Sequence, residues 1–246
     1  MKNIGVILAR GASKRLPRKN LHLLGGLPLI AWTCRAACAS TIDRVIVSTE
    51  DSGIAEIAKS HGVDVPFIRP NELAEDYARD VDIVLHAVDA AQHYYGEMYD
   101  TVTVIQSTSP FVRPEHIDAC IRRYSKGDSS CIFIARKVQD HPRWTWIADD
   151  EGNARPFIGE ALTADEQHSQ NLVKLFYPTG AAWVANIEEV RAQDTIYCGP
   201  IGLVEIPWEY AIDVDEIYDL LIAETLAKHF SILPILSKTE SAASNG

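Results

Sequence analysis

The sequence lacks the features that mark several large classes of protein. It has five cysteines in 246 residues and no C-x-x-C pair, which argues against a disulfide framework and against a cysteine-rich zinc site. No apolar run approaches the ~20 residues that a membrane-spanning helix needs. The apolar stretch Ile4 to Ala9 near the N-terminus is too short for a signal-peptide core. We therefore expect a cytoplasmic protein without a membrane partner.

Positive charge is also scarce. The chain carries 23 Lys and Arg against 34 Asp and Glu, which gives a formal net charge of −11. An acidic surface repels phosphodiester backbones, so we expect no nucleic-acid partner. A small anionic ligand would need a local cluster of cations.

Apolar strand-like runs alternate with helical patterns through the first half of the chain. The run Ile4 to Ala9 is almost wholly apolar, which is typical of a strand buried on both faces. The alternation predicts an α/β fold in which helices cover both faces of a mostly parallel sheet. The predicted strands are residues 4–9, 44–49, 66–68, 101–106 and 131–135, and the predicted helices are residues 28–39, 51–60, 82–93 and 114–124.

The periodicity breaks between about Lys137 and Phe176, where prolines, glycines and mixed charges follow one another. This stretch is typical of an excursion inserted into a domain rather than of its core. The regular patterns that follow are strands over 181–185 and 201–206 and a helix over about 216–230. We predict one domain over residues 1–236, and a flexible tail over the small, polar residues 237–246.

A basic loop follows the first predicted strand. Residues 10–20 read RGASKRLPRKN and contain no acid but five cations, Arg10, Lys14, Arg15, Arg18 and Lys19. The carboxyl ends of parallel strands are where open α/β sheets bind ligands. The small residues from Gly11 to Ser13 leave room for phosphate oxygens to approach backbone N–H groups.

Two common phosphate-binding motifs do not match this loop. It has neither the glycine spacing of G-x-x-x-x-G-K-[ST] nor that of G-x-G-x-x-G, which disfavours kinases with a phosphate loop and ordinary dehydrogenases. Composition alone also leaves open a merely solvated basic loop.

The segment Leu8 to Asn20 follows the pattern L-A-R-x-x-S-K-x-L-P-x-K-N. It closely resembles the opening motif of the acylneuraminate cytidylyltransferases, the CMP-sialic acid synthetases. Four later stretches resemble motifs of that family in the same order, namely residues 46–50 (IVSTE), 69–76 (RPNELAED), 106–110 (QSTSP) and 212–215 (IDVD). The resemblance covers about residues 3–225.

The resemblance implies a three-layer Rossmann-like nucleotidyltransferase fold with a small dimerisation excursion at about 137–176, hence a homodimer. It also implies a reaction in which a hydroxyl of a keto-sugar acid attacks the α-phosphorus of CTP, and pyrophosphate leaves. Cations, a metal ion and alignment would then supply most of the catalysis. The implied catalytic residues are Arg10, Lys19, Gln106, Asp213 and Asp215.

The resemblance also assigns binding roles. Arg10 and Lys19 would hold the triphosphate, and Asn20 and Arg69 would position the cytidine. The full set implied for the nucleotide is Leu8, Ala9, Arg10, Gly11, Ser13, Lys19, Asn20, Arg69, Ala78 and Asp80. Gln106 would contact the acceptor sugar, although its residue type and place before a turn fit a turn-stabilising amide equally well.

Asp213 and Asp215 are two residues apart, so in an extended segment both carboxylates point to one side. This arrangement suits Mg²⁺, which takes one or two carboxylates together with phosphate oxygens and water. From the residues alone, Asp215 could instead cap the helix that begins near Glu216. The resemblance favours the magnesium site.

The acceptor half departs from the family pattern. Uncharged residues, Trp144, Ser169 and Tyr177, stand at three positions where the family has cations that would hold the acceptor's carboxylate. The predicted acceptor-binding residues are therefore Gln106, Arg143, Lys174 and Tyr177, and Arg155 is a further candidate. A Trp144 or Tyr177 face could stack on a less polar acceptor.

These departures leave three readings of the function open. The first is the family reaction with an acidic, sialic-acid-like sugar as the acceptor. The second is nucleotidyl transfer to a phosphonate or a sugar phosphate, and the third is an inactive nucleotide-binding homologue. Asp80, an acceptor of hydrogen bonds near the expected base, also leaves guanine open beside cytosine.

Overall fold

A six-stranded sheet lies at the centre of the computed structural model, which describes residues 1–230. The predicted tail at 237–246 and the last residues of the predicted domain lie outside this range. The sheet order is β10 (Ile201–Glu205), β6 (Cys131–Lys137), β9 (Phe176–Asn186), β5 (Thr101–Gln106), β1 (Asn3–Leu8) and β4 (Arg44–Ser48). All pairs are parallel except those of β9, which runs antiparallel to β5 and β6.

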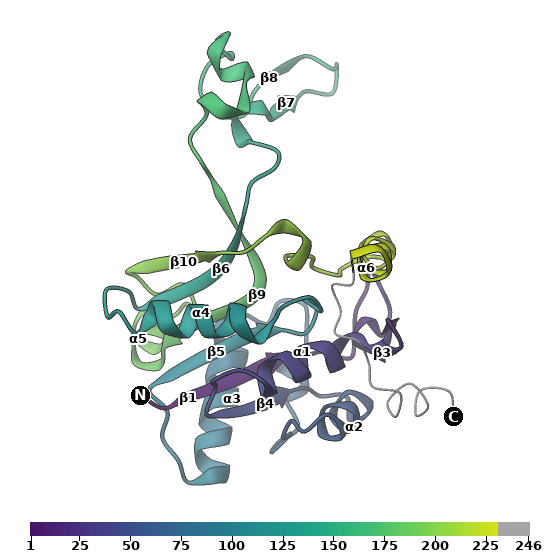
Figure 1. Cartoon of the computed structure of the whole chain (residues 1–246), viewed down its shortest axis with the longest axis vertical. Helices are drawn as coiled ribbons and strands as arrows, with labels where there is room; N and C mark the ends of the chain where they lie inside the picture. The colour runs from purple at the N-terminus through teal and green to yellow at the C-terminus, as the bar shows by residue number, and fades with distance from the viewer. Residues whose placement is uncertain (231–246) are drawn as a thin grey trace.

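Helices cover both faces of this sheet, as Figure 1 shows. One face packs against α1 (Leu29–Cys38), α2 (Ser52–Ser60) and α4 (Pro114–Tyr124), and the other against α3 (Asp80–Tyr95) and α5 (Ile187–Gln193). Along β1, Ile4 and Val6 enter one core and Ile7 enters the other, because successive side chains of a strand point to opposite faces. The three-layer fold predicted from the sequence is therefore confirmed.

The remaining elements lie around this framework. The helix α6 (Ile217–Phe230) packs with α1 and the short hairpin of β2 (Leu23–Leu24) and β3 (Leu27–Pro28) in a third apolar cluster. Short 3-10 turns lie at Lys19–Leu21, Asn71–Leu73, Pro142–Trp144, Asp165–Gln167, Ser169–Asn171 and Trp208–Tyr210. The five cysteines are free. Among residues 1–230, no helix is both long and apolar enough to cross a bilayer.

Two strand predictions need correction. Residues 66–68 form no strand, and the only pairing near them within the described chain is one bridge between Ile46 and Asp64. Pro66 lacks the N–H group that a ladder needs. The strand predicted at 181–185 is longer, because β9 begins at Phe176, where the chain returns from the excursion and pairs with β6.

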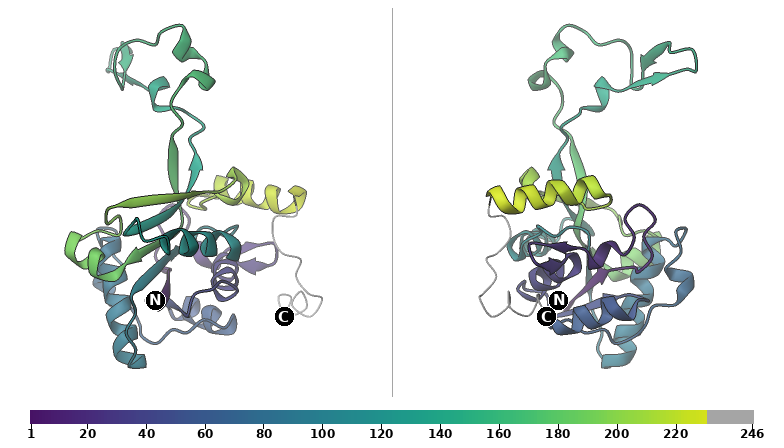
Figure 2. Two further views of the ribbon diagram at one scale, coloured as in Figure 1. Left: turned by 60° about the vertical axis from the view of Figure 1, so that its left-hand side comes forward. Right: turned by 90° about the vertical axis from the view of Figure 1, so that its right-hand side faces the viewer.

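The predicted excursion is a projecting arm, residues 138–175, between β6 and β9. Figures 1 and 2 show it standing away from the body on two extended legs. Its end carries a two-stranded sheet of β7 (Trp146–Ala148) and β8 (Ala154–Pro156). At its root, Arg136 and Lys137 of β6 pair with Tyr177 and Phe176 of β9. The sequence boundaries of the excursion are thus close to those of the arm.

Arg143 holds the arm together, which differs from the acceptor contact predicted for it. Its guanidinium donates to both carboxylate oxygens of Glu166, with Nη2–Oε2 at 2.8 Å, and to the carbonyl oxygens of Ile158 and Glu160. These bonds lower the pKa of Glu166 to about 2. The donors of Arg143 are therefore already used inside the arm.

We expect Glu166→Gln to loosen the arm without unfolding the body. The substitution keeps the side-chain size but removes the charge that Arg143 binds in two places. Trypsin should then cut after Arg143 and Lys174 severalfold faster, while the melting temperature of the body changes little. Glu151→Gln, an exposed acid of the same arm, is the control; equal cleavage of the two variants would contradict this role.

Candidate active site

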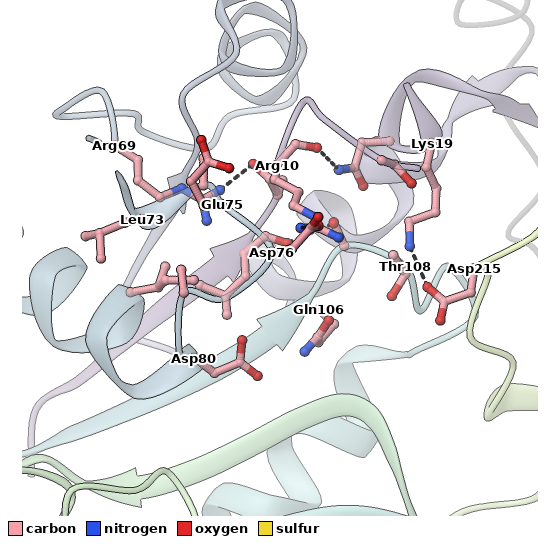
Figure 3. A pocket seen from close by; sticks show the side chains of 18 residues that line it. Arg10, Lys19, Arg69, Leu73, Glu75, Asp76, Asp80, Gln106, Thr108 and Asp215 are labelled. Carbon is pink, nitrogen blue, oxygen red and sulfur yellow. Dashed lines mark hydrogen bonds and ion pairs between the residues drawn. The ribbon is translucent and has the colours of Figure 1, made fainter. Parts of the chain in front are cut away.

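A cleft of about 260 Å³ lies at the carboxyl ends of β1 and β5. Leu8 and Gln106 are partners in the register of these two strands and lie at the floor of the cleft. Residues from 69 to 83 form one of its walls. Figure 3 shows the side chains that face into it. Nine of the ten predicted nucleotide-binding residues line the cleft, namely Leu8, Ala9, Arg10, Ser13, Lys19, Asn20, Arg69, Ala78 and Asp80.

Gly11 is the exception. It is not part of the lining, and its amide N–H donates to Oε1 of Glu50 at 2.6 Å, so this N–H is not free for a phosphate. A side chain at this position would meet Asp51, because an added Cβ would lie 2.7 Å from Oδ2 of that residue. Asp51 in turn caps α2 by accepting the N–H of Ile54. Gly11 therefore allows the loop to lie against the start of α2.

We expect Gly11→Ala to lower the free energy of unfolding by about 1–3 kcal/mol, because the new methyl group must displace either the loop or the cap at Asp51. Urea unfolding measures the change. Ala12→Ser adds one atom at the next, exposed position and should have little effect. A similar loss of stability in both variants would show that the close approach of Gly11 to Asp51 is not the cause.

Arg69 and Asn20 lie buried beneath the cleft, each with 3% of its surface exposed. Nη2 of Arg69 donates to the carbonyl oxygens of Ala9 and Ser48 at 2.7 and 2.8 Å, and the guanidinium pairs with Glu50 at 3.3 Å. Nδ2 of Asn20 donates to the carbonyl oxygen of Arg10. Both side chains thus hold the backbone at the ends of β1 and β4, and their contacts with cytidine stay a prediction.

Four cations of the basic loop form ion pairs with two carboxylates. Asp76 binds Arg10 at 2.8 Å and also Lys14, and these bonds lower its pKa. Asp215 binds Lys19 at 2.6 Å and also Arg15. The two pairs of cations thus bind different carboxylates, and a bound polyphosphate could replace these carboxylates as their partner.

Asp215 does not cap α6, which was the alternative role that the sequence left open. Its carboxylate accepts from Lys19 and Arg15, while the carboxylate of Asp219 accepts the N–H groups of Asp215 and Glu216 at the start of α6. The carboxylate of Asp215 therefore lies on the cleft side of α6, where a ligand can reach it.

Asp213 faces the same space as Asp215. Its side chain is open to solvent, yet surrounding protein displaces enough water to raise its pKa, and the charge of Asp215 adds to this while Thr108 opposes it. A Cβ built on Gly180 would lie 3.9 Å from Oδ2 of Asp213 and from Cγ of Gln106, so these residues converge.

The carboxylate pair fits a magnesium ion that is completed by substrate. Within the described chain, no group of three or more His, Cys, Asp or Glu forms a self-sufficient metal site. Two neighbouring carboxylates on the wall of a cleft suit a hard cation that keeps water and phosphate ligands. Asp213 and Asp215 would hold such an ion.

A second, wider cleft of about 760 Å³ adjoins the first. The two share Asp80, Gln106 and Asp215 in their linings. Of the predicted acceptor-binding residues, Gln106 and Tyr177 line the second cleft, whereas Arg143 and the exposed Lys174 line neither. The side chains that sequence reasoning missed there include Arg15, Arg136, Trp183, Tyr197 and Trp208.

Few sequence signals pointed to the missed residues. In the first cleft, Asp76 and Thr108 belong to motifs of the family resemblance, so those motifs could have suggested them. Arg136 carries no such signal, because its place depends on the pairing of β6 with β9.

A sequence model described as cytidylyltransferase matches residues 4–224. The pseudaminic acid cytidylyltransferase of Campylobacter jejuni is 29% identical over 233 residues, which cover 93% of this chain and 97% of that protein. The CMP-N,N'-diacetyllegionaminic acid synthase of Legionella pneumophila is 31% identical over 231 residues, covering 92% and 96%.

The fold also matches solved structures. The CMP:2-keto-3-deoxy-manno-octonic acid synthetase complexed with CTP aligns with 94% of this chain and all of that chain, with a TM-score of 0.66 at 15% identity. The 4-diphosphocytidyl-2C-methyl-D-erythritol synthase of Anaerococcus prevotii gives a TM-score of 0.64 at 12% identity. At these identities the likeness supports the nucleotidyltransferase fold alone. Because the family model spans nearly the whole chain, this protein belongs to the cytidylyltransferase family.

Proposed function

We propose that this protein is a magnesium-dependent cytidylyltransferase that transfers CMP from CTP to a sialic-acid-like nonulosonic acid or a related keto-sugar acid, with release of pyrophosphate. The observation that carries the proposal is the meeting of two clefts at Gln106 and Asp215. One cleft holds the cations suited to a triphosphate, and the other is large enough for a sugar acid. The names of the relatives from Campylobacter and Legionella agree with this acceptor class.

In this proposal the nucleotide lies in the first cleft and the acceptor in the second. Arg10 and Lys19 leave Asp76 and Asp215 to bind phosphate oxygens, and they offset the charge that builds on the leaving pyrophosphate. The acceptor's hydroxyl oxygen bonds to the α-phosphorus as the bond to pyrophosphate breaks, and the proton of this hydroxyl passes to solvent water. Gln106, at the junction, orients the acceptor. Magnesium, held by Asp213 and Asp215, would neutralise phosphate charge.

Measurement of pyrophosphate release tests the proposal. The purified protein is incubated with Mg²⁺ and CTP against a panel of nonulosonic acids, 3-deoxy keto-acids, phosphonates and sugar phosphates, with GTP in parallel. We expect release with CTP and an acidic keto-sugar. Release only with a phosphonate, a sugar phosphate or GTP would mean that the acceptor or base site differs from the proposal. Nucleotide binding without release from any member would indicate an inactive homologue.

We further propose that the protein acts as a cytoplasmic homodimer joined through its arm. The arm exposes apolar side chains, including Trp146, Phe157 and Val173, that an isolated chain leaves in water. The free thiols agree with a reducing compartment. Sedimentation at micromolar concentration should show a dimer, and a monomer there would contradict the proposal.

A further inference from the structure

The second cleft contains an arginine whose charge the protein leaves largely uncompensated. Arg136 lies on β6 at the root of the arm, half-buried, and lines this cleft. Across residues 1–230 it forms no ion pair, and Nη1 donates to the carbonyl oxygen of Lys137 at 3.3 Å. A half-buried guanidinium without a carboxylate partner retains most of its capacity to bind an anion.

Tyr177 holds this guanidinium in place. The two residues are partners in the register of β6 and β9, and Cζ of Arg136 lies 5.1 Å from the centre of the Tyr177 ring. Contact with the face of a ring restrains a guanidinium while leaving N–H groups at its edge free to donate. Arg136 therefore places a cation beside position 177, where the sequence itself has none.

The other charged residues of the second cleft also favour Arg136 as the position where an anion binds. Five carboxylates belong to its lining, those of Asp80, Asp213, Asp215, Glu216 and Asp219. The second cation of the lining, Arg15, is bound by Asp215 and Glu216. An acidic ligand is thus repelled along most of the wall and meets an available cation at Arg136.

Within one chain, Arg143 and Lys174, the basic residues predicted to bind the acceptor, are not placed to bind an anion in this cleft. The donors of Arg143 are used by Glu166 and by arm carbonyls, and Lys174 lies outside the lining of the cleft. We infer that Arg136, stacked on Tyr177, binds the carboxylate of the acceptor. The inference rests on the proposed function, because it takes the acceptor to be an acid.

The test compares Arg136→Gln with Lys137→Gln. Arg136→Gln should raise KM for the keto-sugar acid about 10- to 100-fold, the effect of one lost charge-assisted contact, and leave KM for CTP unchanged. Arg136→Lys should restore part of the loss. Lys137 is the matched control, because the adjacent residue of a strand points to the other face and this one does not line the cleft. A purely structural role would change both KM values together.

The outcomes separate this inference from the proposed function. If the wild-type protein turns over an acid and Arg136→Gln does so with the same acceptor KM, the inference is wrong and the function stands. If no acid is turned over, N-acetylneuraminic acid and 3-deoxy-manno-octulosonic acid are titrated by calorimetry onto the CTP-loaded protein. Binding that is lost in Arg136→Gln supports the inference while the function fails; no binding to the wild type overturns both.

Discussion

The Asp215→Asn protein is expected to release pyrophosphate at least about a thousandfold more slowly than the wild type, since one metal ligand supplies several kcal/mol of transition-state stabilisation. The carboxylate of Asp215 lies at the junction of the two clefts, beside Asp213 and within 2.6 Å of Lys19. Asparagine keeps the shape but loses the charge that a magnesium ion requires. Continuous assays of pyrophosphate release, at increasing Mg²⁺, measure the loss.

A structural role for Asp215 would give a different result. Because Asp219 accepts the N–H groups at the start of α6, the substitution should leave that helix and the melting temperature nearly unchanged. Glu216→Gln removes the same charge from the next residue, which pairs with Arg15 at 3.5 Å, and should cost only a fewfold change in rate. Wild-type turnover and an unchanged Mg²⁺ requirement in Asp215→Asn would refute the metal assignment.

The second large effect is expected for Lys19→Gln, with kcat about 10²- to 10³-fold lower, the usual consequence of removing one group that stabilises developing charge. Only 14% of the Lys19 side chain is exposed, and its ammonium group faces the cleft. In the variant, water therefore replaces the lost ammonium group poorly. Steady-state kinetics with CTP, together with equilibrium binding of CTP, separate loss of rate from loss of affinity.

The control for Lys19→Gln comes from the same loop. Arg18 is exposed and lines neither cleft, so Arg18→Gln removes one positive charge at the neighbouring position without a predicted phosphate contact. Arg18→Gln should reduce activity only slightly, because it weakens the positive electrostatic potential of the loop. If the two variants lose activity equally, the loop acts through its net charge, and the specific contact of Lys19 with the triphosphate is wrong.

Much of the fold was predictable because local patterns agreed with the final packing. The apolar run of β1 lies between two cores, Asp51 caps α2, and the loss of periodicity after Lys137 marks the departure of the arm. Each of these depends on residues close in sequence. The direction of β9 could not be predicted in this way, because it follows from the return of the chain along β6.

The site was predictable where residues follow strand ends and unpredictable where distant segments meet. Leu8 and Gln106 end neighbouring strands, so their meeting followed from the parallel sheet. The bond from Gly11 to Glu50 and the burial of Arg69 required contacts between segments far apart in the chain. The same is true of Arg136, which reaches the second cleft only because β6 pairs with β9.

The overlap of the two clefts affects how substrate range can diverge. In the described part of the chain their linings share Asp80, Gln106 and Asp215, while the remaining wall of the second cleft comes, apart from Arg15, from β6, β9 and the segments that follow. Substitutions in β6 and β9 leave the basic loop and its carboxylate partners in place. Under the proposed function, acceptor choice can therefore change nearly independently of nucleotide use, by drift or by directed evolution.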